Sequence, residues 1–227
     1  MELQRKIRPN QYQIQAALVV FRISFAFYIA KLIFELFRYS IWTKVHNNVP
    51  IAPRQLALVE IIEIFTWLFQ ILFFVLCAIF LLIWIYRAYS NLGQFQRLQY
   101  PKNMSVIGWF LPVFSWFGPF MIYSAIVRGY EEVLATQNYI RRNPRRHSLK
   151  NWWWITWVLG GILLIPGFGY SRFDLFCSAM SAAVLMLSNL LLISSLSHMK
   201  MMEEGIGNLK NVTQSARTSD DLLDDML

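Results

Sequence analysis

Charged residues are scarce in this chain of 227 residues: Asp, Glu, Lys and Arg together make up 15% of it, whereas soluble domains contain roughly 25%. Hydrophobic residues make up 56% and aromatic residues 16%. A chain of this kind has too much apolar surface to stay disordered in water and too little charge for a soluble globular enzyme. The composition therefore indicates an integral membrane protein.

Cysteine and histidine are also rare, with two and three copies. Cys77 and Cys177 each lie within an apolar run, so neither a disulfide framework nor a thiolate metal site is expected. None of the histidines lies in the middle of a predicted helix, which argues against a pair of facing haem ligands. The sequence contains no glycine-rich phosphate loop, HExxH string or GxSxG elbow. We expect no catalytic residue, no metal and no cofactor.

Five apolar segments dominate the sequence, at residues 16–37, 61–86, 104–127, 152–168 and 175–197. A helix needs about 20 mostly apolar residues to cross the hydrocarbon core of a bilayer. The second and fifth segments reach that length, and the fourth is short but begins with a tryptophan cluster typical of a membrane interface. The pattern predicts an all-α membrane protein.

The third segment contains Pro112 in its middle and Pro119 seven residues later. Each proline removes a backbone donor, and the carbonyl groups it frees must be satisfied by protein or water. The segment is therefore either a kinked spanning helix or a re-entrant element that returns to the side from which it came.

The distribution of basic residues favours re-entry. The net charge is +8, and the basic residues lie between apolar segments, which indicates membrane topology rather than nucleic-acid binding. With a re-entrant third segment, 15 basic residues of the tails and loops fall in the cytoplasm and 3 outside, as the positive-inside rule requires. If all five segments cross and the N-terminus is cytoplasmic, more basic residues fall outside than inside, against the positive-inside rule. If all five cross and the N-terminus is external, the excess of basic residues inside is only small. We expect four transmembrane helices plus one re-entrant segment, with both termini cytoplasmic.

This topology divides the chain into three parts. Residues 1–15 form a basic cytoplasmic N-terminal tail and residues 16–204 form the helical membrane domain. Residues 205–227 are polar and end in an acidic stretch, so they are expected to form a flexible tail.

One string of polar and aromatic residues, WIYRAYSNLG at residues 84–93, follows the second apolar segment. Arg87 and Asn91 are four residues apart and share a helix face. Both could donate hydrogen bonds to carbonyl groups of the broken third segment, as in a small polar transport site. The alternative is that they satisfy backbone and lipid headgroups at a helix end. The candidate polar site comprises Trp84, Arg87, Asn91, Trp109, Pro112 and Pro119.

The same string, followed by GWFLP at residues 108–112, by Pro119 and by Trp152-Trp153, resembles the bacterial "domain of unknown function 4328" family. The matching positions lie between about residue 80 and residue 157. The resemblance implies a multi-pass membrane protein in bacteria, and we expect it in the cytoplasmic membrane. It identifies no catalytic residue.

A second group of candidates consists of charges within the first two apolar helices. An antiparallel pair of helices joined by a loop would bring the charges of the first helix to the depth of those of the second. Ionisable groups in a membrane are costly unless they are paired. We predict that Lys31 or Arg38 pairs with Glu63 or Glu60, either as a simple interhelical ion pair or as part of a proton or cation relay through Glu35 and Glu63.

A basic run precedes the fourth apolar segment and would face the cytoplasm. It contains Arg141, Arg142, Arg145, Arg146 and Lys150. Such a run either only sets the topology or also contacts anionic lipid headgroups. The acidic C-terminal tail is a candidate contact for a protein partner, or for this basic run.

These features favour a non-enzymatic accessory or scaffold subunit of a membrane complex. The first alternative is a small transporter or channel with its site at the broken third segment. The second is a membrane-embedded lipid-modifying enzyme, which would need acid, base or metal groups brought together from distant parts of the chain.

Overall fold

The computed structural model describes residues 10–111, 117–136, 146–164 and 171–224, and within α-helices it describes the side chains of all of these except residues 146–151 and 206–224. The described residues form helices and turns, without a strand. The six helices are α1 (Gln11–His46), α2 (Pro53–Leu92), α3 (Met104–Ile107), α4 (Gly118–Thr136), α5 (Arg146–Leu164) and α6 (Arg172–Asp224).

Local sequence signals set several of the helix ends. Helix α2 begins at Pro53, a residue favoured in the first turn because its fixed φ suits a helix and its missing N–H needs no partner there. Helix α6 begins with a reciprocal cap: the Asp174 backbone N–H donates to Ser171 Oγ (3.1 Å), and the Ser171 N–H donates to Asp174 Oδ2 (3.0 Å). Two of the free donors of the first turn are thereby satisfied.

Among the helices that the structure describes, three are long and apolar enough to cross a membrane: α1, α2 and the Arg172–Gly205 part of α6. The fourth predicted segment lies in α5, whose apolar part, Trp152–Leu164, is shorter than a full crossing. The all-helical prediction is confirmed, but the described residues contain three helices long enough to cross rather than the expected four plus a further element.

The third predicted segment is not one continuous helix in the described residues. The short helix α3 ends at Ile107, a turn follows, and α4 begins at Gly118. Helix α4 is amphipathic: its buried face includes Ile122 and Tyr123, whereas Arg128 and Glu132 are exposed. Pro119 is the second residue of α4, a position where its missing backbone donor needs no partner.

Beyond Gly205 the backbone of α6 remains helical to Asp224, and the flexibility expected of residues 205–227 stays a prediction. The residues after Gly205 include Leu, Lys, Gln, Ala and Arg and no proline. A helix already formed in the membrane part extends into such a sequence at little cost, because propagation avoids the penalty of nucleation.

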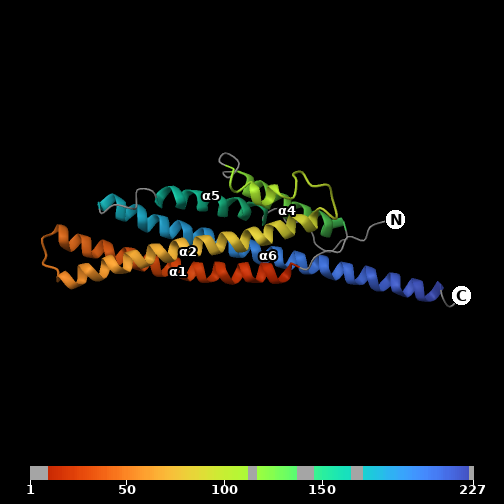
Figure 1. The fold of residues 1–227 in the computed structure, drawn as a ribbon, viewed down its shortest axis with the longest axis horizontal. Helices are drawn as coiled ribbons and strands as arrows, with labels where there is room; N and C mark the ends of the chain where they lie inside the picture. Colours follow the sequence, from red (N-terminus) through yellow and green to blue (C-terminus); the bar gives the residue numbers. More distant parts are fainter. Residues whose placement is uncertain (1–9, 112–116, 137–145, 165–170, 225–227) are drawn as a thin grey trace. The chain divides into compact units, whose positions relative to one another are not determined.

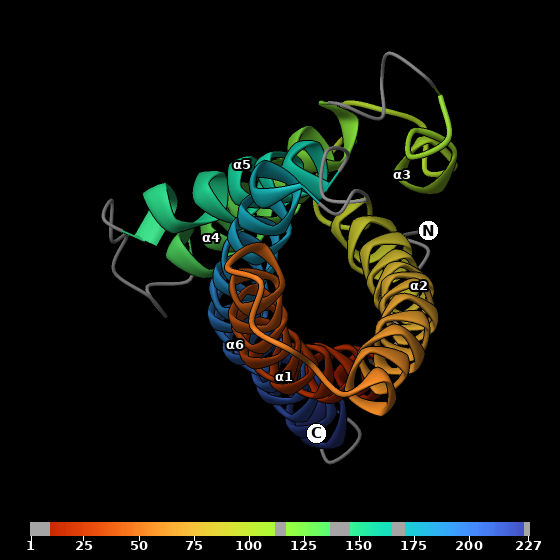
Figure 2. The ribbon, with the colours of Figure 1, turned by 90° about the vertical axis from the view of Figure 1, so that its left-hand side faces the viewer.

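The chain divides into two compact units. Unit 1 contains residues 1–16, 81–144 and 196–227, and unit 2 contains residues 17–80 and 145–195. The three long helices each contribute to both units. Figure 1 shows α1 and α2 side by side and antiparallel, joined at one end by the short connection at residues 47–52, and Figure 2 views the helices end on.

In unit 2, α5 packs antiparallel to α6. Ser188 donates a hydrogen bond to the Trp153 carbonyl (2.9 Å), and Ser181 donates to the Gly160 carbonyl (2.8 Å). The seven-residue step from Trp153 to Gly160 along α5 therefore matches the seven-residue step from Ser188 back to Ser181 along α6, as expected for antiparallel helices. Gly160 permits this close approach, since a Cβ there would lie 2.7 Å from the Leu185 side chain.

Unit 1 is held together by aromatic residues. Trp84 of α2 is fully buried and lies 5.9 Å, between ring centroids, from Tyr123 of α4. The Tyr89 hydroxyl donates to the Tyr100 carbonyl (3.2 Å) and accepts from the Tyr100 N–H (3.0 Å), which fixes the loop after α2 to that helix.

Candidate functional site

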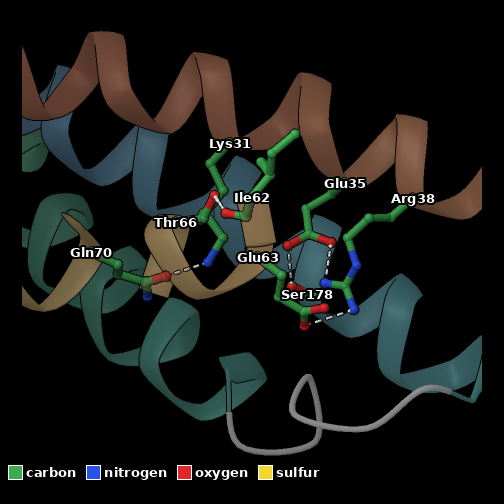
Figure 3. Close-up of polar contacts among 8 residues, drawn as sticks. All are labelled: Lys31, Glu35, Arg38, Ile62, Glu63, Thr66, Gln70 and Ser178. Atoms are coloured by element: carbon green, nitrogen blue, oxygen red, sulfur yellow. Dashed lines mark hydrogen bonds and ion pairs between the residues drawn. The ribbon is translucent and has the colours of Figure 1, made fainter. Parts of the chain in front are cut away.

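The charged residues of α1 and α2 meet inside unit 2 (Figure 3). Arg38 Nη1 lies 3.1 Å from Glu35 Oε2, one turn earlier on α1, and its Nη2 lies 3.0 Å from Glu63 Oε1 on α2. Ser178 of α6 donates to the other oxygen of Glu35 at 2.7 Å. One guanidinium group therefore joins two carboxylates, and three helices are linked through them.

Lys31 lies on the same face of α1, one turn before Glu35. Its ammonium group donates to the Gln70 side-chain oxygen of α2 and lies 5.3 Å from the centroid of the Trp67 ring. Both partners carry no formal charge, so the lysine is held by an amide dipole and an aromatic face. We refer to Lys31, Glu35, Arg38, Glu63, Gln70 and Ser178 as the charge cluster.

The charge cluster is almost completely buried. Lys31 and Glu35 are 3% exposed and Arg38 is 5% exposed, whereas the Glu63 side chain is 16% exposed. The two cations and two carboxylates sum to zero formal charge. A neutral, mutually paired set is the arrangement in which ionisable groups are least costly in a low-dielectric interior.

The structure thus brings four of the five predicted ion-pair residues together. Arg38 contacts Glu63 across the two helices, which is one of the pairings expected from the sequence. Glu60, the alternative carboxylate, is exposed one turn before Glu63.

The inward face of α1 continues the polar character of the charge cluster toward the N-terminal end of the helix. Five consecutive inward positions, spaced three or four residues apart, are polar and between 3% and 6% exposed: Ser24, Tyr28, Lys31, Glu35 and Arg38. Ser24 hydrogen-bonds the Cys77 thiol of α2. We call these five residues the polar stripe. Apolar side chains of the same helix, including Ile29, Ile33 and Leu36, are exposed instead, as suits a helix surrounded by lipid.

Unit 1 contains a second buried polar network, centred on Glu203 of α6. Glu203 Oε1 accepts hydrogen bonds from Asn10 Nδ2 (2.9 Å) and from the Trp84 indole (3.2 Å). Its other oxygen, Oε2, is buried and has no hydrogen-bond partner within the described part of the chain. This carboxylate joins the start of α1 to α2 and α6.

Arg87 and Asn91, predicted to act together on the broken third segment, contact two different elements. Arg87 Nη1 donates to the Gln13 amide oxygen of α1 (2.6 Å) when that amide is oriented to satisfy its neighbours. Asn91 is buried and hydrogen-bonds the Tyr130 hydroxyl of α4. Two residues on one helix face can therefore contact different helices. The long arginine side chain reaches past its own helix, whereas the short asparagine contacts only the helix that packs directly on it.

Tyr130 is the point at which α4 is fixed to α2. Its hydroxyl also donates to the Ala88 carbonyl at 3.2 Å. Burial raises the pKa of Tyr130 well above its usual value, and the nearby Glu203 carboxylate adds to this effect. The phenol therefore remains protonated and serves as a neutral structural bridge.

The remaining predicted residues are dispersed. Trp109 lies in the turn after α3 and is partly exposed, and Pro119 is buried in the first turn of α4. Pro112 and the basic residues Arg141, Arg142 and Arg145 lie outside the described residues. Arg146 and Lys150 lie in the first turns of α5. No three His, Cys, Asp or Glu side chains come together as a metal site in the described ranges.

The structure adds functional candidates that the sequence analysis missed. Gln70 and Ser178 join the charge cluster, and Ser24 and Tyr28 extend it. The three- to four-residue spacing of polar residues along residues 24–38 was a signal for this stripe. Glu203 continues the helical spacing of the buried positions 192, 196 and 199 of α6. The sequence alone does not show which of the adjacent residues Glu203 and Glu204 faces the interior.

Comparison with known proteins identifies the family. The model described as "Domain of unknown function (DUF4328)" matches residues 47–196, well over half of the chain. The chain belongs to this family. The resemblance noted from the sequence is therefore confirmed and extends beyond residues 80–157 on both sides. No curated protein and no solved structure matches the chain.

The DUF4328 match includes parts of both polar groups. It contains Trp84, Arg87 and Asn91 of unit 1 and Glu63 and Ser178 of unit 2. Lys31 and Arg38 precede the match and Glu203 follows it. The partners that complete each group therefore come from outside the matched region.

Proposed function

We propose that this DUF4328 protein is a non-enzymatic accessory or scaffold subunit of a complex in the bacterial cytoplasmic membrane. The observation that carries the proposal is the charge cluster. Arg38 contacts Glu35 at 3.1 Å on α1 and Glu63 at 3.0 Å on α2. Lys31 of α1 donates to Gln70 of α2, and Ser178 adds α6 through its hydrogen bond to Glu35. Charges used in this way fix the arrangement of helices in a bilayer.

The proposed topology has four crossings, with both termini in the cytoplasm. The packing of α5 supports a fourth crossing. Because Trp153 and Gly160 lie beside Ser188 and Ser181, α5 runs along the apolar part of α6 and occupies the same depth. Its apolar part, Trp152–Leu164, extends about 20 Å, and local thinning of the bilayer around the helix can make up the difference from the roughly 30 Å of the hydrocarbon core.

The stretch between α3 and α4 is proposed to re-enter the membrane from the cytoplasmic side. Phe110 and Phe117, on either side of the break, are 74% and 62% exposed. In contact with acyl chains their apolar surface would be removed from water, at about 25 cal/mol per Å². Charged side chains on the exposed face of α4 support an interfacial helix rather than a crossing one.

Topology can be tested by labelling. Asn143→Cys, introduced after Cys77 and Cys177 have been replaced by serine, should be labelled by a membrane-impermeant maleimide only after the cells are opened. A cysteine at Asn48, in the α1–α2 connection, should be labelled on intact cells. Labelling of Asn143→Cys on intact cells would contradict the proposed topology.

We propose that the partner binds the helical extension of α6. This helix continues 19 residues past Gly205 and ends in the acidic sequence SDDLLD. Basic side chains on a partner would complement it, while the basic run at residues 141–150 contacts anionic lipid headgroups.

The role is tested by purifying the tagged protein from its native membrane in mild detergent and weighing the intact assembly by native mass spectrometry. The expected result is a protein partner at fixed stoichiometry that is lost from the triple variant Asp220→Asn, Asp221→Asn and Asp224→Asn. A matched control is Glu131→Gln and Glu132→Gln on α4. A protein that carries one bound small molecule or lipid and no protein partner would refute the scaffold role and favour a transporter.

A further inference from the structure

The interior of unit 2 is more polar than packing of the helices requires. The polar stripe runs from Ser24 to Arg38, about 21 Å along α1, and each of its members is at most 6% exposed. Gln70 and Cys77 of α2 face it through contacts with Lys31 and Ser24. Ser178 of α6 contacts Glu35. Polar groups buried at this depth are costly, and proton relays are one of the functions for which membrane proteins retain them.

The charge cluster is asymmetric in a way that suits proton transfer. Glu63 is its most accessible member, with 16% of its side chain exposed. Lys31 is only 3% exposed, as is Glu35, and donates to a neutral amide. Lys31 can therefore lose its proton without breaking a hydrogen-bonded ion pair, whereas Arg38 stays charged at any ordinary pH. Glu35 lies between Lys31 and Arg38 on the same face of α1.

We propose that the interior of unit 2 is a proton relay, entered at Glu63 and passing through Glu35 to Lys31. The Lys31 ammonium transfers a proton to a water molecule, and Lys31 becomes a neutral amine. That water carries the proton away along the polar stripe, past Tyr28 and Ser24. A proton taken up by the Glu63 carboxylate then moves by way of Glu35 to the neutral Lys31 amine. One proton enters as one leaves, so the cluster returns to zero net charge and no oxidant or reductant is needed.

This relay goes beyond the scaffold role, because it gives the membrane part an activity of its own. The groups that face Lys31 are Glu35 and Arg38 on α1, and Glu63, Trp67 and Gln70 on α2. Arg38 holds both carboxylates in place and is a positioning residue. The groups that exchange protons are Glu63, Glu35 and Lys31.

The test uses the full chain in sealed liposomes of phosphatidylethanolamine and phosphatidylglycerol that contain the pH-sensitive dye pyranine. A potassium gradient with valinomycin sets a membrane potential, and the rate of internal acidification is compared with that of protein-free liposomes. Lys31→Gln and Glu63→Gln should each lower the protein-dependent rate about tenfold or more, as expected for loss of a positioned proton-transfer group. Glu60→Gln, exposed one turn away, is the matched control and should leave the rate unchanged.

Lys31→Arg separates a relay from a structural cation. Arginine keeps the positive charge and can still donate to Gln70, but it does not release its proton. The relay predicts that Lys31→Arg conducts as poorly as Lys31→Gln while it retains wild-type elution and helical circular dichroism. Wild-type conduction in Lys31→Arg, or a wild-type protein that acidifies liposomes no faster than lipid alone, would overturn the proposal.

Discussion

Removal of the Arg38 guanidinium should destabilise the protein strongly. The guanidinium contacts Glu35 at 3.1 Å and Glu63 at 3.0 Å, and both arginine and Glu35 are at most 5% exposed. Arg38→Gln leaves two carboxylates close together in the interior without the cation that contacts both of them. Breaking a buried ion pair by removing one partner costs about 3 to 5 kcal/mol, which corresponds to a fall of roughly 10 °C in Tm for a chain of this size.

The measurement is thermal unfolding in detergent micelles, followed by intrinsic fluorescence of the nine tryptophans. Since the unfolding of a membrane protein is commonly irreversible, the apparent Tm of every variant is compared at one heating rate. Glu60→Gln serves as the control, because that carboxylate is exposed on the same helix as Glu63.

A double-mutant cycle separates the ion pair from general disruption. Arg38→Gln combined with Glu63→Gln removes one of the uncompensated carboxylates, and the remaining Glu35 keeps its hydrogen bond from Ser178. The double variant should therefore be more stable than the sum of the single losses predicts, with a coupling energy of about 1 to 3 kcal/mol. An Arg38→Gln variant that melts within a degree or two of the Glu60→Gln control would refute the reasoning.

Two further substitutions test the packing of each unit. Gly160→Ala places a Cβ 2.7 Å from the Leu185 side chain and should lower the stability of the protein by about 1 to 3 kcal/mol. Its control, Gly161→Ala, meets open space and should leave the stability unchanged or raise it by up to about 1 kcal/mol through helix propensity. Equal melting temperatures for the two variants would contradict the packing of α5 on α6. Trp84→Phe removes the indole donor to Glu203 and should lower the stability of the protein by about 1 to 3 kcal/mol. The loss should be smaller in a Glu203→Gln background. Strictly additive losses in the same melting assay would exclude the contact.

The apolar segments of the sequence predicted the positions of the helices well. Low charge and long apolar runs require helices wherever a chain crosses lipid, since every backbone group must be satisfied within the segment. Pro112 and Pro119 predicted a break, and the structure has one between α3 and α4. The helical extension of α6 was not predicted. Composition indicates whether an isolated segment would form a helix, whereas a helix that has already formed extends without paying the cost of nucleation again.

The pairing of charges was only partly readable from the sequence. Helical periodicity placed Lys31, Glu35 and Arg38 on one face, and the antiparallel connection brought α2 near that face. The choice between Glu60 and Glu63 depends on the rotation of α2 about its axis, which is set by packing along its whole length. The same holds for Arg87 and Asn91, whose partners Gln13 and Tyr130 belong to helices that the sequence does not place beside them.

The sequence by itself determined that this protein is helical, that it is embedded in a membrane, that it belongs to the DUF4328 family and that its first helix carries charges on one face. These are properties of composition, periodicity and local motifs, and each can be read within a few turns of helix. Only the tertiary structure decided that Gln70 and Ser178 complete the charge cluster, and that Asn10 and Trp84 converge on Glu203. Contacts between residues 39 to 193 positions apart depend on how whole helices rotate and pack, and no local pattern records that.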